Sequence, residues 1–436
     1  MVAYYYPPVS GGGVQRTLKF AKYLPQFGWK PYILTVRSGY DYYFDESLEK
    51  DIVKAITVHR TRSIEPMKWI RKWVKRLTDY RTVKKENIVL KQGQVKRHPW
   101  LLKLKDSVFI PDGEIGWLPF AVLRGWRVMR RENIDLIYST SSPYTDHIIA
   151  LLLNKWTRKP WIADFRDPWS LNMLAPQFGW RRFVDRTLEK IVLRNTNKTI
   201  AVTEPIANGF RRIYPLGSYR TIPNGYDEED FISLDSKKYA VDKFNITYTG
   251  ILSKENSPNR FLTALSELLD DKPYLREDFL VRFVGQFDKP GEVNNYHFLM
   301  SLGLSDVVEL ISHVPHSESI HYCSSADVLL LIVSDGPGRD GIMTGKVFEY
   351  LRCGKPIFAV VPPEGVAAKL IRGTQLGVVA HPQSITEIKD TLSVLYKKYK
   401  SRALKKLQGR GDIDRYSRYH LTRMLAQECN ELVQQG

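Results

Sequence analysis

Short apolar runs alternate with longer stretches of helical period along most of the chain. The opening run MVAYYY is aromatic and β-rich, and the turn-forming PPVSGGG separates it from a helical stretch. That stretch places apolar residues at Val14, Leu18, Ala21 and Leu24, which is the spacing of one buried helix face. The strand PYILTV follows. This order predicts a βαβ unit, and such units build parallel sheets.

The same alternation continues in two groups of elements. The first group has apolar strands at IDLIYST (134–140), PWIADF (160–165) and KTIAVT (198–203), with helices between them. The second group begins at Phe244 and has six candidate strands, namely FNITYTG, FLVRFVG, VVELIS, ADVLLLIV, PIFAVV and GVVA. The polar, turn-rich TIPNGYDEEDF lies between the two groups and is typical of a linker.

These patterns predict an α/β protein with two Rossmann-like, parallel-sheet domains that face each other across a cleft. We expect the first domain at residues 1–215 and the second at 216–412, with the helical stretch 413–436 docking back on the first domain. A length of 436 residues suits two domains, and 43% hydrophobic with 26% charged residues is typical of a globular protein. Ligands of such sheets bind beyond the carboxyl ends of the strands, so motifs there are the first candidates for function.

The net charge of +18 is concentrated in one insertion of the first domain. Residues 54–105 carry 16 Lys and Arg against 3 Asp and Glu, which is +13 and leaves only +5 for the rest of the chain. Such a local excess indicates an anionic partner, and nucleic acid, an anionic lipid surface and a phosphorylated substrate are the three candidates.

The membrane surface is favoured because residues 66–81, PMKWIRKWVKRLTDYR, combine an apolar stripe at helical spacing with cations and tryptophans. The residues expected to contact an anionic membrane surface are Trp69, Lys72, Trp73, Lys75 and Arg76. A solvated helix packed on the domain is the alternative. A nucleic-acid partner is not expected, since no recognised nucleic-acid module is visible.

Cysteine usage and the start of the chain indicate the compartment. Cys323, Cys353 and Cys429 have neither metal-ligand spacing nor an obvious pairing pattern, as expected in a reduced, cytoplasmic environment. The chain has no run of 18 apolar residues, and its start lacks the basic head and apolar stretch of a secretory signal. Together with the amphipathic stretch, this predicts a cytoplasmic protein that is peripheral on the inner face of the cell membrane.

The stretch DGIMTGKVFEYLRCGKPIFAV contains a Gly-Lys pair but is not a Walker phosphate loop. Asp340 stands where that loop needs its first glycine, and Val347 stands where it needs Ser or Thr. A buried strand, a Gly-rich loop and a helix start nevertheless predict an anion site, because the first N–H groups of a helix are free. We expect Thr344, Gly345 and Lys346 to bind a diphosphate there.

Glu349 lies five residues beyond Thr344, which is roughly 7 Å along a helix. This is about the separation between a diphosphate and the ribose hydroxyls of a nucleotide, so the carboxylate can accept hydrogen bonds from O2′ and O3′. A surface glutamate on a capped helix is the alternative. No D-x-D pair in a suitable context and no His, Cys and carboxylate set is evident, so neither a metal nor another cofactor is expected.

At these motifs the sequence resembles the family-4 glycosyltransferases, the retaining members of the two-domain GT-B fold. The resemblance covers nearly the whole chain and rests on YYPPVSGGGVQR, ADFRDPW, AVTEPIANGF, TIPNGYDEEDF, YTGIL and TGKVFEYLRCGKPIFAV. It implies a ribose-binding role for Glu349. The family usually has a second glutamate, eight residues earlier, that contacts the donor sugar. Gly341 occupies that position here, and Asp340 is the candidate replacement.

The resemblance also implies roles for residues near the first loop and the YTG strand. The loop with Gly12 and Gly13 would face the donor phosphates and the acceptor. From their place in the first helical turn, Gln15 and Arg16 are candidates to contact the acceptor or the donor sugar, with solvated side chains as the alternative. The arginine that usually follows the glycine of YTG is replaced by Ile251, so Lys254 is the candidate diphosphate contact.

Charged residues also follow the strand PWIADF. Asp164, Arg166 and Asp167 are expected to point into the cleft, and the resemblance places this segment beside the transferred sugar or the acceptor. His147 is a candidate contact to the donor sugar, with a buried helix histidine as the alternative. His313 and His316 follow another strand and are candidates for the base pocket. Asp164, Asp167 and His147 are thus the catalytic candidates.

The expected function is that of a retaining glycosyltransferase. It would move a sugar from a nucleotide-diphosphate sugar to a glycan acceptor in cell-surface polysaccharide biosynthesis. We expect this acceptor to be lipid-linked. One alternative is a non-catalytic GT-B scaffold or regulator at the membrane, which Gly341 and Ile251 favour. A second alternative is a GT-B sugar-nucleotide epimerase, which would need more carboxylates and histidines in the cleft than the sequence offers.

Overall fold

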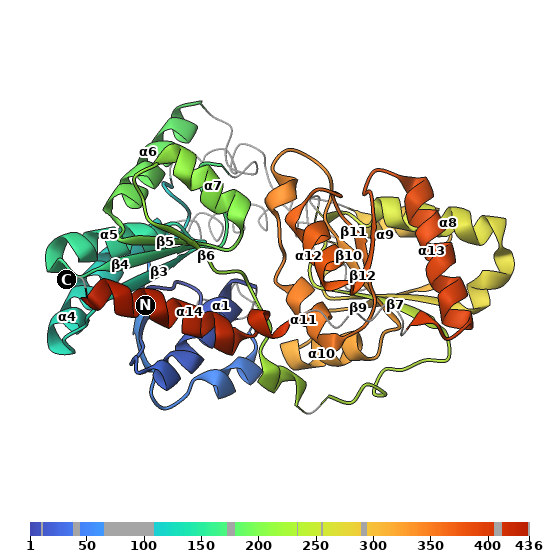
Figure 1. Ribbon diagram of the computed structural model, residues 1–436, viewed down its shortest axis with the longest axis horizontal. Coiled ribbons are helices and arrows are strands. Elements are labelled where there is room, and N and C mark those ends of the chain that lie inside the picture. Colours follow the sequence, from blue (N-terminus) through green and yellow to red (C-terminus); the bar gives the residue numbers. More distant parts are fainter. Residues whose placement is uncertain are drawn as a thin grey trace, which may run out of the picture. The chain divides into compact units, whose positions relative to one another are not determined.

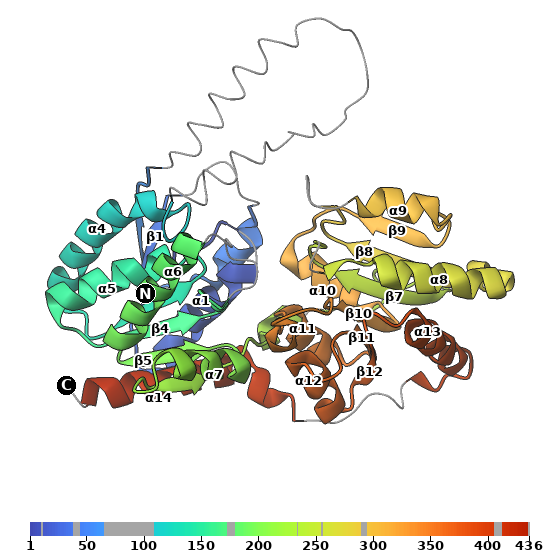
Figure 2. The same cartoon turned by 90° about the horizontal axis from the view of Figure 1, so that it is seen from above.

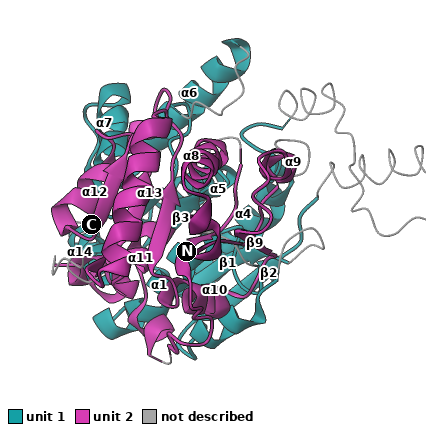
Figure 3. Cartoon of the chain, turned by 90° about the vertical axis from the view of Figure 1, so that its right-hand side faces the viewer, with its two compact units in different colours: residues 1–222, 422–436 teal, residues 223–421 magenta. Residues whose placement is uncertain are grey.

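The chain folds into two compact units. A computed structural model describes residues 1–9, 12–37, 44–64, 109–171, 179–232, 234–253, 256–288, 294–404 and 412–434. Unit 1 comprises residues 1–222 and 422–436, and unit 2 comprises residues 223–421 (Figure 3). The first boundary falls inside TIPNGYDEEDF rather than at 215/216, and the second falls within the last helix rather than at 412/413. No helix in the described parts of the chain is long and apolar enough to cross a bilayer.

Unit 1 is built on a parallel sheet. Its strands are β1 (Tyr32–Val36), β2 (Thr57–Thr61), β3 (Ile137–Ser141), β4 (Trp161–Phe165), β5 (Lys198–Ala201) and β6 (Tyr219–Thr221). The first residues of the chain join β1 to β3, since Val2 N–H donates to Tyr138 O at 2.7 Å and Leu34 N–H donates to Met1 O at 2.8 Å. The sequence predicted a strand at MVAYYY, but in this stretch only Val2 forms β-bridges, to Leu34 and Ser139. The strand order therefore reverses beside these residues, with β1 and β2 on one side and β3 to β6 on the other.

Helices cover both faces of the unit 1 sheet (Figure 1). They are α1 (Gly12–Tyr23), α4 (Leu118–Arg131), α5 (Thr145–Thr157), α6 (Gly179–Asn195) and α7 (Glu204–Ile213), with the 3-10 helices η1 (Leu24–Phe27), η2 (Glu46–Asp51) and η3 (Ile115–Trp117). One core holds Val14, Leu18 and Ala21 of α1 against Ile33 of β1, as the helical period predicted. A larger core packs α4, α5 and α7 against β3, β4 and β5.

The last helix, α14 (Arg418–Gln434), begins in unit 2 and belongs to unit 1 from Thr422 onward. Its half in unit 1 is held by polar contacts. Lys198 Nζ lies 2.6 Å from Glu428 Oε2, and the indole N–H of Trp29 donates to Asn430 Oδ1 at 2.9 Å. The return of the C-terminal helix to the first domain is thereby confirmed.

Unit 2 contains all six strands that the sequence predicted. They are β7 (Phe244–Thr249), β8 (Phe279–Val284), β9 (Val308–Ile311), β10 (Val328–Ile332), β11 (Ile357–Val360) and β12 (Gly377–Ala380). They form one parallel sheet in the order β12-β11-β10-β7-β8-β9 (Figure 2). The order reverses between β7 and β10, which is where such sheets bind ligands at their carboxyl edge.

Both faces of the unit 2 sheet are buried. The helices are α8 (Asn259–Asp271), α9 (Asn295–Ser301), α10 (His316–Ser324), α11 (Lys346–Cys353), α12 (Val366–Thr374) and α13 (Ile385–Lys400), with the 3-10 helices η4 (Glu228–Phe231), η6 (Pro273–Glu277), η7 (Arg339–Gly341) and η9 (Asp414–Tyr416). Along β10, Leu330 joins the core under α8 and α13, whereas Leu329 and Leu331 join the core under α10, α11 and α12. This two-sided burial explains why the strand reads as a continuous apolar run.

Two glycines close the carboxyl ends of β7 and β8. Gly250 has φ +116° and Gly285 has φ +125°, a region that other residues rarely adopt. A Cβ on Gly285 would also overlap the carbonyl oxygen of Gly250. The two backbones therefore approach each other closely at this edge because Gly285 carries no side chain.

We predict that Gly285→Ala destabilises unit 2 by about 3 kcal/mol or more, because it adds a steric overlap to backbone strain. Gly303→Ala is the matched control, since Gly303 has φ +62° with open space around it and should cost only about 1–2 kcal/mol. Urea unfolding of both variants gives the comparison. Equal losses would show that the close approach to Gly250 carries no energy.

Candidate active site

The carboxyl edge of the unit 1 sheet brings three sequence-predicted features together. Arg166, the first residue beyond β4, donates from Nε to the carbonyl of Ser141 at 2.6 Å and from Nη2 to the carbonyl of Ser142. A Cβ on Gly13 would overlap the Arg166 guanidinium, so the glycine admits that side chain to the start of α1. Asp167 is exposed and accepts a hydrogen bond from Ser142 Oγ at 3.3 Å. Gly12 is the first residue of α1.

The segment that carries Arg166 and Asp167 is held in place by hydrogen bonds to two acidic residues of α6. Glu189 accepts hydrogen bonds from the backbone N–H groups of Trp169 and Ser170, both at 3.1 Å, and from the Ser170 hydroxyl. Burial raises the pKa of Glu189 to about 7. The indole N–H of Trp169 donates to Asp185 at 3.3 Å. These acids on a helix had no sequence signal for this role, because nothing local marks them as partners of a distant loop.

Asp164 and Arg16 do not point into an open site, contrary to expectation. Both side chains are 0% exposed and form a two-pronged ion pair, with Nε to Oδ2 at 2.7 Å and Nη2 to Oδ1 at 2.8 Å. The Tyr138 hydroxyl also donates to Asp164 at 2.5 Å, and Arg16 donates to the carbonyl of Ile222 at 2.9 Å. The pair links α1 to β4 inside unit 1, which is a structural arrangement.

His147 also lies inside unit 1 rather than at a surface. Its Nδ1 is 2.8 Å from Ser139 Oγ, and its ring centroid is 4.2 Å from that of Phe165. Burial lowers the pKa of His147 to about 3, so the ring is neutral. The alternative of a buried helix histidine describes this residue, and the ring has no exposed edge with which to reach a donor sugar.

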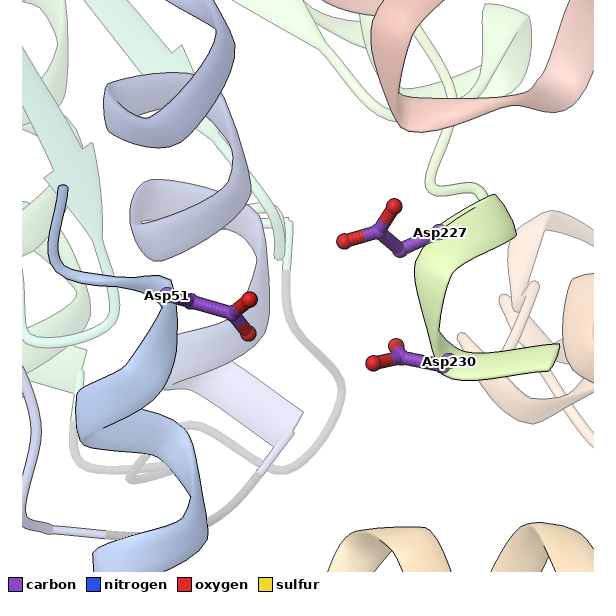
Figure 4. Close-up of side chains that lie close together, drawn as sticks. All are labelled: Asp51, Asp227 and Asp230. Atoms are coloured by element: carbon purple, nitrogen blue, oxygen red, sulfur yellow. The ribbon is translucent and has the colours of Figure 1, made fainter. Parts of the chain in front are cut away.

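A third charged cluster in unit 1 lies between α1 and η2. Asp51, drawn in Figure 4, lies 2.7 Å from Lys19 Nζ and 2.8 Å from Lys22 Nζ, and all three side chains are buried. Lys19 and Lys22 on α1 are thus neutralised in part by the carboxylate of Asp51, the last residue of η2.

In unit 2 the predicted anion site is built around α11. The side chain of Lys346 crosses the carboxyl end of β7, where Nζ lies 3.9 Å from the ring centroid of Tyr248, and a Cβ on Gly250 would meet it at 2.7 Å. Burial lowers the pKa of Lys346 to about 7, although Glu349 acts in the opposite direction. Among the described residues, no carboxylate lies within 4.0 Å of this amine. Because the amine of Lys346 contacts the ring of Tyr248 and no described carboxylate, it can bind an anionic ligand.

The start of α11 supplies further groups. Gly345 is the N-cap residue with open space around its Cα, and the buried Thr344 hydroxyl has no hydrogen-bond partner in the described parts of the chain. The helix ends at Gly354 with φ +66°, as the sequence predicted. A buried hydroxyl without a hydrogen-bond partner among the described residues, together with a cation at the start of a helix, favours a diphosphate.

Glu349 lies one turn beyond Lys346 and is held by a histidine. Glu349 Oε1 is 3.0 Å from His316 Nε2, and His316 Nδ1 is 3.9 Å from Asp230 Oδ2. Asp230 and Asp227, the N-cap of η4, are both drawn in Figure 4. The sequence placed His316 near the base pocket but gave no sign that it contacts Glu349, because the two residues lie on different helices.

The remaining predicted site residues are placed as follows. Asp340 is exposed on η7, beyond the carboxyl end of β10. Lys254 lies outside the described residues, and so do the membrane-contact candidates Trp69, Lys72, Trp73, Lys75 and Arg76. Their roles stay predictions.

Solved structures with the same architecture were found across the whole chain. Sucrose-phosphate synthase from Thermosynechococcus elongatus is 14% identical with a TM-score of 0.67, and the match covers 100% of this chain and 98% of that chain. A glycosyltransferase from Rickettsia africae ESF-5 is 16% identical with a TM-score of 0.65 and the same coverage. HepE from Anabaena, solved with UDP and glucose, is 15% identical with a TM-score of 0.63, covering 99% and 98%. At these identities the likeness shows the fold, which is GT-B.

Two family models match consecutive parts of the chain. The model described as Glycosyltransferase Family 4 matches residues 81–230, and the model described as Glycosyl transferases group 1 matches residues 232–410. The chain therefore belongs to the family-4, group 1 glycosyltransferases. The comparison with curated protein sequences gave no match.

We predict that Arg16→Met costs about 3–5 kcal/mol of unfolding free energy, because it leaves the Asp164 carboxylate buried without its cation. Arg211→Met is the control, since the Arg211–Glu204 pair is exposed and should be worth less than about 1 kcal/mol. Denaturant unfolding measures both. A loss of activity without a loss of stability would instead assign Arg16 to ligand binding.

Proposed function

We propose that this glycosyltransferase is a retaining, metal-independent enzyme that uses a nucleotide-diphosphate sugar. The observation that carries the proposal is the group of Thr344, Lys346 and Glu349 on α11, at the point where the strand order of unit 2 reverses. Among the described residues, the amine has no carboxylate within 4.0 Å and the hydroxyl has no hydrogen-bond partner, which suits a diphosphate, and a carboxylate one turn further suits the ribose. HepE, which has this fold, was solved with UDP and glucose, which supports a UDP-sugar as the first donor to test.

The chemistry follows from charge. As the bond between the anomeric carbon and the diphosphate oxygen breaks, negative charge develops on the leaving diphosphate. Lys346 and the N–H groups at the start of α11 stabilise that charge, and Lys254 is a further candidate. Burial lowers the pKa of the Lys346 amine, so the free site disfavours its charged form. A bound diphosphate acts in the opposite direction and favours the protonated amine. The acceptor hydroxyl attacks the same face that the diphosphate leaves, and its proton passes to the leaving phosphate oxygen.

On the acceptor side we retain Asp167 as the catalytic candidate. It is the exposed member of the three carboxylate and histidine candidates, whereas Asp164 and His147 are buried. Arg166 and Asp340 remain candidates for contacts to the sugar or the acceptor.

The acceptor itself is proposed to be a glycan, lipid-linked and presented at an anionic membrane surface, within cell-surface polysaccharide biosynthesis. Its support is the +13 charge of residues 54–105 in the sequence of the first domain. The second candidate function is a non-catalytic scaffold, which the missing glutamate at Gly341 and the exposed Ile251 favour.

The proposed function is tested by calorimetry and turnover. We expect UDP, GDP, ADP or dTDP, one of them preferentially, to bind in the presence of a chelator, and the matching nucleotide sugar to be consumed with retention at the anomeric carbon. Binding that requires a divalent ion would contradict the metal-independent mechanism. Binding without turnover on any glycan acceptor would favour the scaffold.

A second prediction concerns Glu349. Glu349→Ala should weaken binding of the preferred nucleoside diphosphate roughly 10- to 100-fold, because hydrogen bonds to a charged group are lost. Where the preferred nucleotide is a ribonucleotide, the substitution should also remove the preference for it over its 2′-deoxy form, which calorimetry measures directly. Glu277→Ala is the control, since Glu277 is exposed at the amino edge of the same sheet. A preserved preference in the Glu349 variant would exclude the ribose role.

A further inference from the structure

Helix α6 exposes an apolar row on the surface of unit 1. Trp180 is 50% exposed, Phe183 is 72% exposed and Ile191 is 40% exposed. Their spacing of three and then eight residues, with the exposed Thr187 between them, places them along one side of the helix. Large apolar side chains in an ordered row on an outer helix face have no role in the core of unit 1.

A basic row runs beside the apolar row. It consists of Arg182, Arg186, Lys190 and Arg194, which repeat every fourth residue and are all exposed. Among the described residues, none of the four has a carboxylate within 4.0 Å. Like charges four residues apart destabilise a helix slightly, so helix stability does not account for this row of cations.

The two acids of α6 face the opposite way. Asp185 and Glu189 are buried, and they bind Arg181 and the Trp169–Ser170 backbone, as described above. Arg181 in turn donates to the carbonyl of Phe109 at 2.8 Å and to that of Pro111. Helix α6 (Figure 1) is therefore anchored through its inner face. Its exposed residues include four cations and no carboxylate.

We propose that the outer face of α6 docks on an anionic lipid bilayer. An apolar row containing Trp and Phe beside a row of cations is what an interfacial helix needs, since the rings enter the headgroup boundary and the cations approach the anionic headgroups. The outer side of a single helix is convex and forms no groove that could bind a peptide. Nucleic acid would pair with the cations, but its sugar-phosphate backbone offers no apolar surface for the exposed ring of Phe183. Charge complementarity and the exposed rings thus both select the bilayer.

The position of α6 in the fold relates this surface to the candidate active site. The helix follows β4 and begins at the carboxyl edge of the unit 1 sheet, where Arg166 and Asp167 lie. Trp180 and Phe183 are in its first turns, so docking would bring that edge near the membrane. This inference rests on the proposed lipid-linked acceptor for its purpose, but the docking itself requires no turnover.

The test is sedimentation of the full-length protein with vesicles of phosphatidylcholine alone or mixed with phosphatidylglycerol. Two variants are used, Arg186→Glu/Lys190→Glu/Arg194→Glu and Trp180→Ser/Phe183→Ser. We expect the first to lower the partition coefficient on anionic vesicles at least roughly tenfold and to flatten its salt dependence. We expect the second to lower it while leaving the salt dependence unchanged.

The charge-matched control is Lys237→Glu/Lys369→Glu/Lys397→Glu, which reverses three exposed cations of unit 2. Equal losses in the two triple variants would overturn the proposal, because only net charge would matter. Binding to duplex DNA or polyglutamate in place of anionic vesicles would also overturn it. Thermal unfolding confirms that each variant is folded, and nucleotide affinity should be unchanged, so failure of docking and failure of the transferase function are distinguished.

Discussion

Both halves of this protein depend on one topological constraint, the reversal of strand order within a parallel sheet. At that point successive crossovers leave in opposite directions, so the carboxyl ends of two neighbouring strands are not covered by a connecting helix. In unit 1 the opening lies beside the first residues of the chain, and Gly13 and Arg166 occupy it. In unit 2 it lies between β7 and β10, and Gly250 and Lys346 occupy it. Each opening pairs a glycine, which permits close approach, with a cation.

The two cations differ in how they are satisfied, and this difference separates their roles. Arg166 is engaged by the carbonyls of Ser141 and Ser142, so it fixes the geometry of a strand end. Lys346 has an aromatic ring beneath it and burial that disfavours its charge. The first arrangement already has backbone partners in the absence of a ligand. The second becomes more favourable when an anion arrives, which is the behaviour expected of a binding residue.

The fold was predictable because most strands are buried on both faces and therefore appear as uninterrupted apolar runs. All six strands of unit 2 were found in this way, whereas the anion site at α11 was inferred from the Gly-Lys stretch and stays a prediction. The failures have a shared cause. Position near a strand end does not tell whether a residue still belongs to the strand, with its side chain packed inside, or lies beyond the strand at the edge of the sheet. Asp164 lies within β4 and turns inward to Arg16, whereas Arg166, two residues later, lies beyond the strand at the edge. His147 likewise follows a strand but lies on the inner side of α5.

Helix α14 has a consequence for how the two halves can be separated. Because the helix starts in unit 2 and finishes in unit 1, unit 1 is discontinuous along the chain. A fragment that stops before Thr422 would lose Glu428 and leave the largely buried amine of Lys198 without its carboxylate. Isolated halves suitable for binding studies would thus have to be made by supplying residues 422–436 as a separate peptide or by joining them to the start of the chain through a linker.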